Sequence, residues 1–150
     1  MAFEGIRSWA QATITQVERI EAARREAFSA DEQKFKGMRK FQTERHLFLV
    51  AANKLTENIA WAKKLDFLEP SLFLEFEELK KDIKDMRDLN EHAIEYFLGQ
   101  GRCKEKWIKE DETAIADASS TIDDRIGNRL SWNAVSTAAI KLLDRLPIHY

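Results

Sequence analysis

Apolar residues recur along the first two thirds of the chain at spacings of three, four and seven, which is typical of one face of a helix. The pattern predicts a first helix over about 3–28 and a second over about 32–65. It predicts a third helix that starts after Pro70 and runs to about Leu98. The positions expected to face the core are Ile6, Trp9, Thr13, Val17, Ile20, Ala27, Phe35, Met38, Phe41, Phe48, Ala52, Leu55, Ile59, Ala62, Phe73, Phe76, Leu79, Ile83, Met86, Leu89, Ala93, Tyr96 and Phe97.

The pattern changes after this third helix. Residues 102–112 are polar, and we expect them to be irregular apart from a short helical turn. The β-branched residues of 118–122 and 125–129 indicate a short hairpin that turns at Asp123 and Asp124. A final helix is predicted over 132–145, with Trp132, Val135, Ala139, Leu142 and Leu143 on its apolar side.

Local signals mark where these helices begin and end. Asp31 is expected to cap the second helix, and Ser131 the last one, because their side chains accept hydrogen bonds from free backbone amides. Gly37 weakens the start of the second helix and indicates a break near 36–43. Gly99 is expected to end the third helix.

Together these elements predict an all-α protein, a bundle of four main helices with a small β-hairpin before the last one. The length of 150 residues fits a single domain. In this interpretation, residues 1–98 hold the core helices, 99–131 the loop and hairpin, and 132–146 the last helix. The net charge of −2 argues against a general polyanion binder, although a local basic patch remains open.

Location is also indicated by composition. Cys103 is the only cysteine, which fits a reducing compartment. The longest apolar run, residues 47–52, is too short to span a bilayer, and the first residues do not resemble a signal peptide. We therefore expect a cytoplasmic protein that does not bind membranes.

Residues 87–92 read RDLNEH, so that Arg87 and His92 are separated by four residues. This spacing resembles the Arg-x(4–6)-His signature of HEPN domains, small all-helical modules of which many are metal-independent ribonucleases. The bundle and the position of the motif late in a long internal helix are similar as well. A second match, Arg39-x6-His46, has Lys40 after the arginine. We favour the first match because its helix is better defined.

The resemblance implies a homodimer in which the motif helices of two subunits line one cleft. There His92 would transfer the proton of the RNA 2′-hydroxyl, and Arg87 would hold the scissile phosphate. Asp88 would fix the imidazole tautomer or orient Arg87. The resemblance also implies RNA as the substrate, a toxin–antitoxin or defence setting, and a cognate antitoxin or other protein as partner.

Helix geometry offers a different interpretation. Five residues turn an ideal helix by 500°, which leaves Arg87 and His92 about 140° apart on opposite flanks. The pairs with i, i+4 spacing are Arg87 with Glu91 and Asp88 with His92. Under this alternative the motif only makes surface pairs, and the protein is a noncatalytic module that binds a protein or a nucleotide.

Three further residues are candidates for substrate binding. Asn90 lies within the motif, and Arg102 and Lys104 belong to a basic loop that follows it. His92 and Glu95 would supply only half of a metal site, so we expect no metal and no cofactor. Cys103 has basic neighbours but no evident base, and we do not expect it to be a nucleophile.

Overall fold

The computed structural model describes residues 2–29, 34–65 and 68–148. Its four long helices confirm the predicted all-α bundle: α1 (Ala2–Ala27), α2 (Lys34–Leu65), α3 (Leu74–Glu91) and α6 (Trp132–Arg145). The shorter elements are η1 (Pro70–Phe73), α4 (Ala93–Phe97), α5 (Lys104–Trp107), β1 (Ile108–Glu110), β2 (Ile115–Asp117), β3 (Thr121–Ile122), β4 (Arg125–Ile126) and β5 (Leu130–Ser131).

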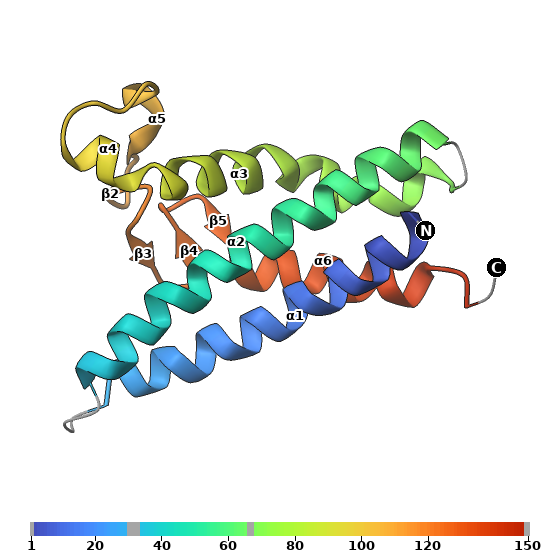
Figure 1. The fold of residues 1–150 in the computed structure, drawn as a ribbon, viewed down its shortest axis with the longest axis horizontal. Coiled ribbons are helices and arrows are strands. Elements are labelled where there is room, and N and C mark those ends of the chain that lie inside the picture. Colours follow the sequence, from blue (N-terminus) through green and yellow to red (C-terminus); the bar gives the residue numbers. More distant parts are fainter. Residues whose placement is uncertain (1, 30–33, 66–67, 149–150) are drawn as a thin grey trace.

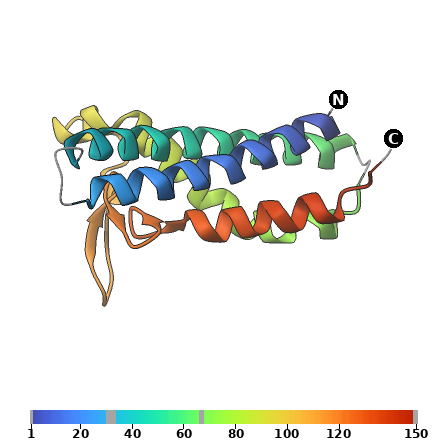
Figure 2. The same cartoon turned by 90° about the horizontal axis from the view of Figure 1, so that it is seen from below.

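The long helices pack around one core. Helices α1 and α2 run side by side along most of their length, with α6 against α1 and α3 against α2 (Figure 1). Seen from below, α1 and α2 form an upper layer and α6 lies beneath them (Figure 2). The start of α1 and the end of α6 lie at the same end of the bundle, where the Arg7 guanidinium donates to the Pro147 carbonyl.

The expected break near residues 36–43 is absent, because α2 is continuous from Lys34. Gly37 is buried against the last turn of α1, and a Cβ there would lie 2.5 Å from the backbone nitrogen of Ala27. Its small size therefore permits close helix packing. The expected cap at Asp31 lies outside the described residues.

Most of the positions predicted to face the core are buried or half-buried, but the prediction is wrong for three of them, which are exposed. Phe35 and Met38 are 77% and 39% exposed, because the first turns of α2 extend past the main core beside the end of α1. Phe97 is 65% exposed, and its ring contacts Trp107 edge-on with a centroid distance of 5.4 Å. It lies on α4, beyond the end of the core helix α3.

The strands lie between α3 and α6 at one end of the bundle (Figure 1). The turn at Asp123 joins β3 and β4 as predicted, with Asp123 at φ 54°, and β5 adds a third antiparallel strand. Residues 102–112, expected to be irregular apart from a short helical turn, contain such a turn as α5. They also contain the strand β1, which pairs antiparallel with β2 beyond this segment. The Ser131 hydroxyl caps α6 as predicted and accepts from the Ala134 amide at 3.0 Å.

Candidate functional site at the end of α3

The motif RDLNEH does not lie within one continuous helix. Helix α3 ends at Glu91, and His92 has φ −104° and ψ 20°, so its amide bonds to the carbonyls of Asp88 and Asn90. Helix α4 then begins at Ala93. The prediction of an unbroken helix to Leu98 is therefore wrong. No Gly or Pro marks the break in the sequence.

Arg87, Asp88 and His92 line one groove beside this break. Its volume is about 620 Å³, and it is lined mostly by charged residues of α3, α4, α5 and the loop between α4 and α5. These residues are Lys84, Asp85, Arg87, Asp88, Leu89, His92, Glu95, Tyr96, Arg102, Cys103 and Lys106. The separation of about 140° expected on a straight helix does not keep Arg87 and His92 apart, because both line this groove. We call it the motif groove.

Arg87 lies between two carboxylates. Its Nε is 3.0 Å from Glu91 Oε1, which confirms the predicted i, i+4 pair, and its Nη1 is 3.0 Å from Asp88 Oδ1. Asp88 also accepts from Lys84 Nζ at 2.5 Å. His92 Nδ1 lies 3.0 Å from Glu95 Oε1, so the structure places Glu95 rather than Asp88 beside the imidazole.

These contacts change how the groups titrate. The hydrogen bond with Asp88 raises the pKa of Arg87, and the nearby Glu91 carboxylate acts in the same direction. Burial raises the pKa of Asp88, but hydrogen bonds from Lys84 and Arg87 outweigh it, so the pKa lies below its ordinary value. Asp88 is therefore an anion at neutral pH, suited to holding Arg87 rather than to carrying a proton.

Of the two basic residues predicted to bind substrate, Arg102 and Lys104, the structure places one at the groove. Arg102 lines the motif groove, whereas Lys104 does not. Lys106 lines it too, with its Nζ 3.2 Å from Asp85 Oδ1. Within the described parts of the chain, Arg102 forms no ion pair. It is the basic side chain of the groove most available to an incoming anion.

Asn90 does not line the groove. Its Nδ2 donates to the carbonyls of Met86 and Ala118, both at 2.8 Å. The side chain therefore joins α3 to the segment between β2 and β3. This structural role is different from the predicted contact with substrate.

Sequence reasoning missed the residues that complete the groove. Lys84 lies four residues before Asp88, which lies four before His92, so helical spacing alone could have placed Lys84 on this face. Tyr96 stacks on Trp107 with centroids 4.7 Å apart, and its hydroxyl accepts from the Cys103 amide at 3.0 Å. No local pattern indicates that contact, since it depends on how the loop folds back.

The second motif match offers no comparable site. Arg39 and His46 are both exposed on α2, and neither lines the motif groove. Within the described residues, no three His, Cys, Asp or Glu side chains gather closely enough to hold a metal ion.

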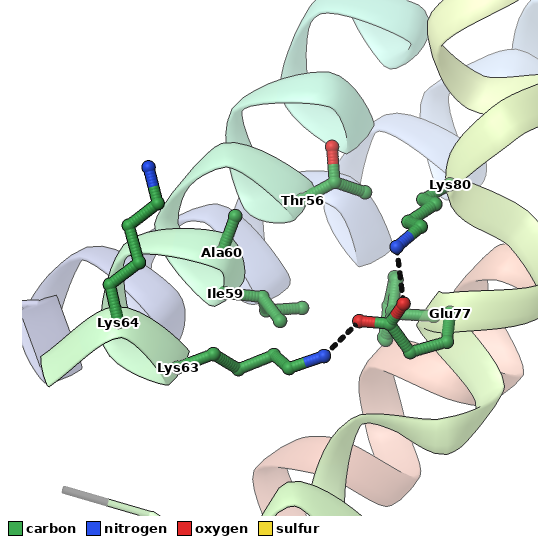
Figure 3. Close-up of a pocket in the computed structure, with 8 residues that line it drawn as sticks. Thr56, Ile59, Ala60, Lys63, Lys64, Glu77 and Lys80 are labelled. Carbon is green, nitrogen blue, oxygen red and sulfur yellow. Dashed lines mark hydrogen bonds and ion pairs between the residues drawn. The ribbon is translucent and has the colours of Figure 1, made fainter. Parts of the chain in front are cut away.

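A second pocket, of about 310 Å³, lies between α2 and α3 (Figure 3). Lys63 and Lys80 both point to the Glu77 carboxylate, while Lys64 points away from it. Their hydrogen bonds lower the pKa of Glu77. The carboxylate occupies the position between the two converging lysines and offsets one of their two charges, so an anion would have to compete with Glu77 for both.

Comparisons with known proteins place the chain in no family: the searches of family models, of curated proteins and of solved structures each found no match. None of the helices in the described residues is both long and apolar enough to cross a membrane.

Proposed function

We propose that the protein is a HEPN-like, metal-independent endoribonuclease that acts at the motif groove as a homodimer. The observation that carries the proposal is that Arg87, Asp88 and His92 line one groove together with Arg102. The proposal includes a cytoplasmic location, a toxin–antitoxin or defence setting, and a cognate antitoxin or other protein as partner.

The proposed reaction is a transesterification within the RNA strand. His92 removes the proton of a 2′-hydroxyl, the 2′-oxygen attacks the adjacent phosphorus, and the bond from phosphorus to the 5′-oxygen of the next nucleotide breaks. The leaving 5′-oxygen takes a proton from water. Arg87 stabilises the charge that develops on the phosphate oxygens. Asp88, 3.0 Å from Arg87, aligns the guanidinium, and Arg102 binds a neighbouring phosphate.

An incoming phosphate must compete with the carboxylates that now hold Arg87. Glu91 is the more replaceable partner, because it bonds only to Nε, whereas Asp88 bonds to Nη1 and is itself held by Lys84. In the proposed dimer, the second subunit's groove faces the first, so that two sets of these side chains enclose one strand.

The test is an endonuclease assay on single-stranded RNA with EDTA present. We expect His92→Ala to lower the rate roughly 100- to 10,000-fold, and Arg87→Ala roughly 100- to 1,000-fold. His46→Ala is the matched control, because His46 is exposed on α2 outside the groove, and it should leave the rate unchanged. Equal rates in all four proteins, or no cleavage under any condition, would contradict the proposal.

The second candidate is a noncatalytic module that binds a partner protein. Two observations favour it: Arg87 and His92 already have carboxylate partners, and α4 exposes Ile94 and Phe97 by 75% and 65%. Sedimentation analysis distinguishes the two candidates. A dimer whose formation parallels cleavage supports the enzyme, whereas a monomer without cleavage supports the module.

A further inference from the structure

A third pocket lies away from the motif groove, between the end of α1, the first half of α2 and the segment that leads into β3. Its volume is about 310 Å³, the same as that of the pocket in Figure 3. Arg24, Arg45, Phe41 and Thr121 are among its lining residues. Figure 1 shows the end of α1, the start of α2 and β3 at the same end of the bundle. We call it the arginine pocket.

Arg45 carries a charge that its surroundings balance poorly. Its Nη1 donates to Thr121 Oγ1 at 2.5 Å, and its guanidinium lies 5.9 Å from the centroid of Phe41. Burial lowers the pKa of Arg45, and the Asp117 carboxylate opposes this shift only in part. Asp117 is itself occupied, since its Oδ1 accepts from Ser119.

Arg24 reaches the same pocket from α1. Its guanidinium lies 5.8 Å from the Trp132 ring. Glu21, one turn earlier on α1, accepts from Trp132 Nε1 at 2.8 Å and so is engaged elsewhere. Among the residues that the structure describes, no carboxylate forms an ion pair with either Arg24 or Arg45.

The contrast with the pocket in Figure 3 is direct. There the two converging lysines share one carboxylate, Glu77. Among the described residues that line the arginine pocket, Asp123 is the one acidic residue; its side chain is 83% exposed and lies 4.0 Å from Arg125. Two guanidiniums therefore line a pocket in which no described carboxylate occupies the position between them.

The remaining wall is apolar. Phe41 is buried and packs edge-on against Trp132, with centroids 6.1 Å apart. Phe28 and Met38 lie at the mouth and are 74% and 39% exposed. Large apolar side chains in these positions offer a flat group a surface to pack on, next to the two cations.

We propose that the arginine pocket binds a phosphorylated small molecule with a planar ring, of the nucleoside monophosphate class. The forked donors of Arg24 and Arg45 hold the phosphate oxygens. Thr121 accepts from Arg45, which leaves its own hydroxyl proton for the ligand. Phe28 and Met38 cover the ring. The proposal does not rest on the ribonuclease activity, because the arginine pocket and the motif groove share no lining residue.

The test is isothermal titration calorimetry of the full chain with AMP, adenosine and inorganic phosphate. We expect AMP to bind at least about tenfold more tightly than adenosine, because the phosphate supplies the charge-assisted bonds. AMP should also bind more tightly than inorganic phosphate, because only AMP has a ring for the apolar wall. The bound phosphate could come from a free nucleotide or from the 5′ end of an RNA, and competition by a 5′-phosphorylated dinucleotide distinguishes them. A dinucleotide that binds more tightly than AMP indicates an RNA end, and one that binds more weakly indicates a free nucleotide.

Matched variants locate the site. Arg24→Gln should weaken AMP binding at least about tenfold, whereas Arg25→Gln, at the exposed neighbouring position of α1, should not. Arg45→Lys, which retains the charge but loses the fork, should weaken binding, whereas Arg39→Lys on the exposed side of α2 should not. His92→Ala should bind AMP as the wild type does. Absence of AMP binding, or equal affinities for Arg24→Gln and Arg25→Gln, would overturn the proposal.

Discussion

At the scale of single residues, Asp111 closes the turn between β1 and β2. Its Oδ1 accepts from the amides of Thr113 and Ala114 at 2.8 and 3.1 Å and from the Thr113 hydroxyl at 2.6 Å. Its Oδ2 accepts from Asn128 Nδ2 at 2.9 Å, which ties this hairpin to the loop before β5. Both oxygens serve as acceptors, so the ionised form of the carboxyl is favoured.

These bonds predict a dependence of stability on pH. The side-chain and backbone hydrogen bonds of Thr113 hold the pKa of Asp111 well below its ordinary value. A group whose pKa is lower in the folded chain stabilises it above the unfolded pKa of about 3.9, and this contribution is lost as the pH falls below that value. Thermal melts between about pH 6 and pH 2 should therefore show a steeper loss of Tm for the wild type than for Asp111→Asn.

Glu112→Gln is the control for this experiment, because Glu112 is an exposed carboxyl at the next position. Its melting curve should follow that of the wild type. Parallel curves for the wild type and Asp111→Asn would show that Asp111 makes no such contribution.

The candidate site was predictable only as far as local spacing reaches. The motif identified Arg87, Asp88 and His92, and all three line the groove. The role of Asn90 was not visible, because its bond to the Ala118 carbonyl joins residues 28 positions apart. The same limit applies to Tyr96, whose place depends on Trp107 and on a loop that turns back on itself.

At the scale of elements, Gly37 shows how packing reverses a local preference. Glycine weakens an isolated helix by about 1 kcal/mol relative to alanine, which is why its position suggested a break. In the fold, however, a Cβ at this position would meet the backbone of Ala27 and Glu26 at 2.5–2.6 Å. Backbone atoms of a packed helix cannot move aside as a flexible side chain can, so the glycine preserves the contact between α1 and α2.

Gly37→Ala should therefore lower the free energy of unfolding by about 1–3 kcal/mol, as overpacking does, despite the better helix propensity of alanine. Gly5→Ala is the matched control: the added methyl would meet Asn58 Oδ1, at the end of a side chain that can rotate, so its cost should be smaller. Urea unfolding followed by circular dichroism measures both. A Gly37→Ala protein more stable than the wild type would contradict this packing.

The other elements differ in how clearly the sequence indicated them. The four long helices followed from apolar periodicity, and the β3–β4 turn from its two aspartates. The β1–β2 pair was missed because Ile108, Glu110 and Ile115 are all exposed. The apolar residues of these strands therefore do not alternate with polar ones in the way that marks a buried face. The helix break at His92 coincides with contacts that α4 makes with Cys103 and Trp107 further along the chain, and not with a breaker residue.

At the scale of the whole molecule, Trp132 connects the last helix to the first two. It begins α6 and is fully buried. Its Nε1 donates to Glu21 of α1, its ring lies beside Arg24, and it packs edge-on against Phe41 of α2. The segment that contains the strands ends where α6 begins (Figure 1), so Trp132 lies at the point at which the chain returns to the bundle.

Trp132→Phe should therefore destabilise the whole bundle. The change removes the Nε1 donor, so the partly buried Glu21 carboxylate loses a hydrogen bond, and the smaller ring makes fewer contacts. Together these losses should lower the free energy of unfolding by about 2–4 kcal/mol. Trp61→Phe is the control, because Trp61 is 47% exposed on α2, and its loss should stay below about 1 kcal/mol. Both are measured by urea unfolding monitored by far-ultraviolet circular dichroism. Because Trp132 contacts both helices of the α1–α2 pair, the unfolding transition of Trp132→Phe should shift as a single step. If the two variants lose equal amounts of unfolding free energy, Trp132 does not hold α6 to the α1–α2 pair.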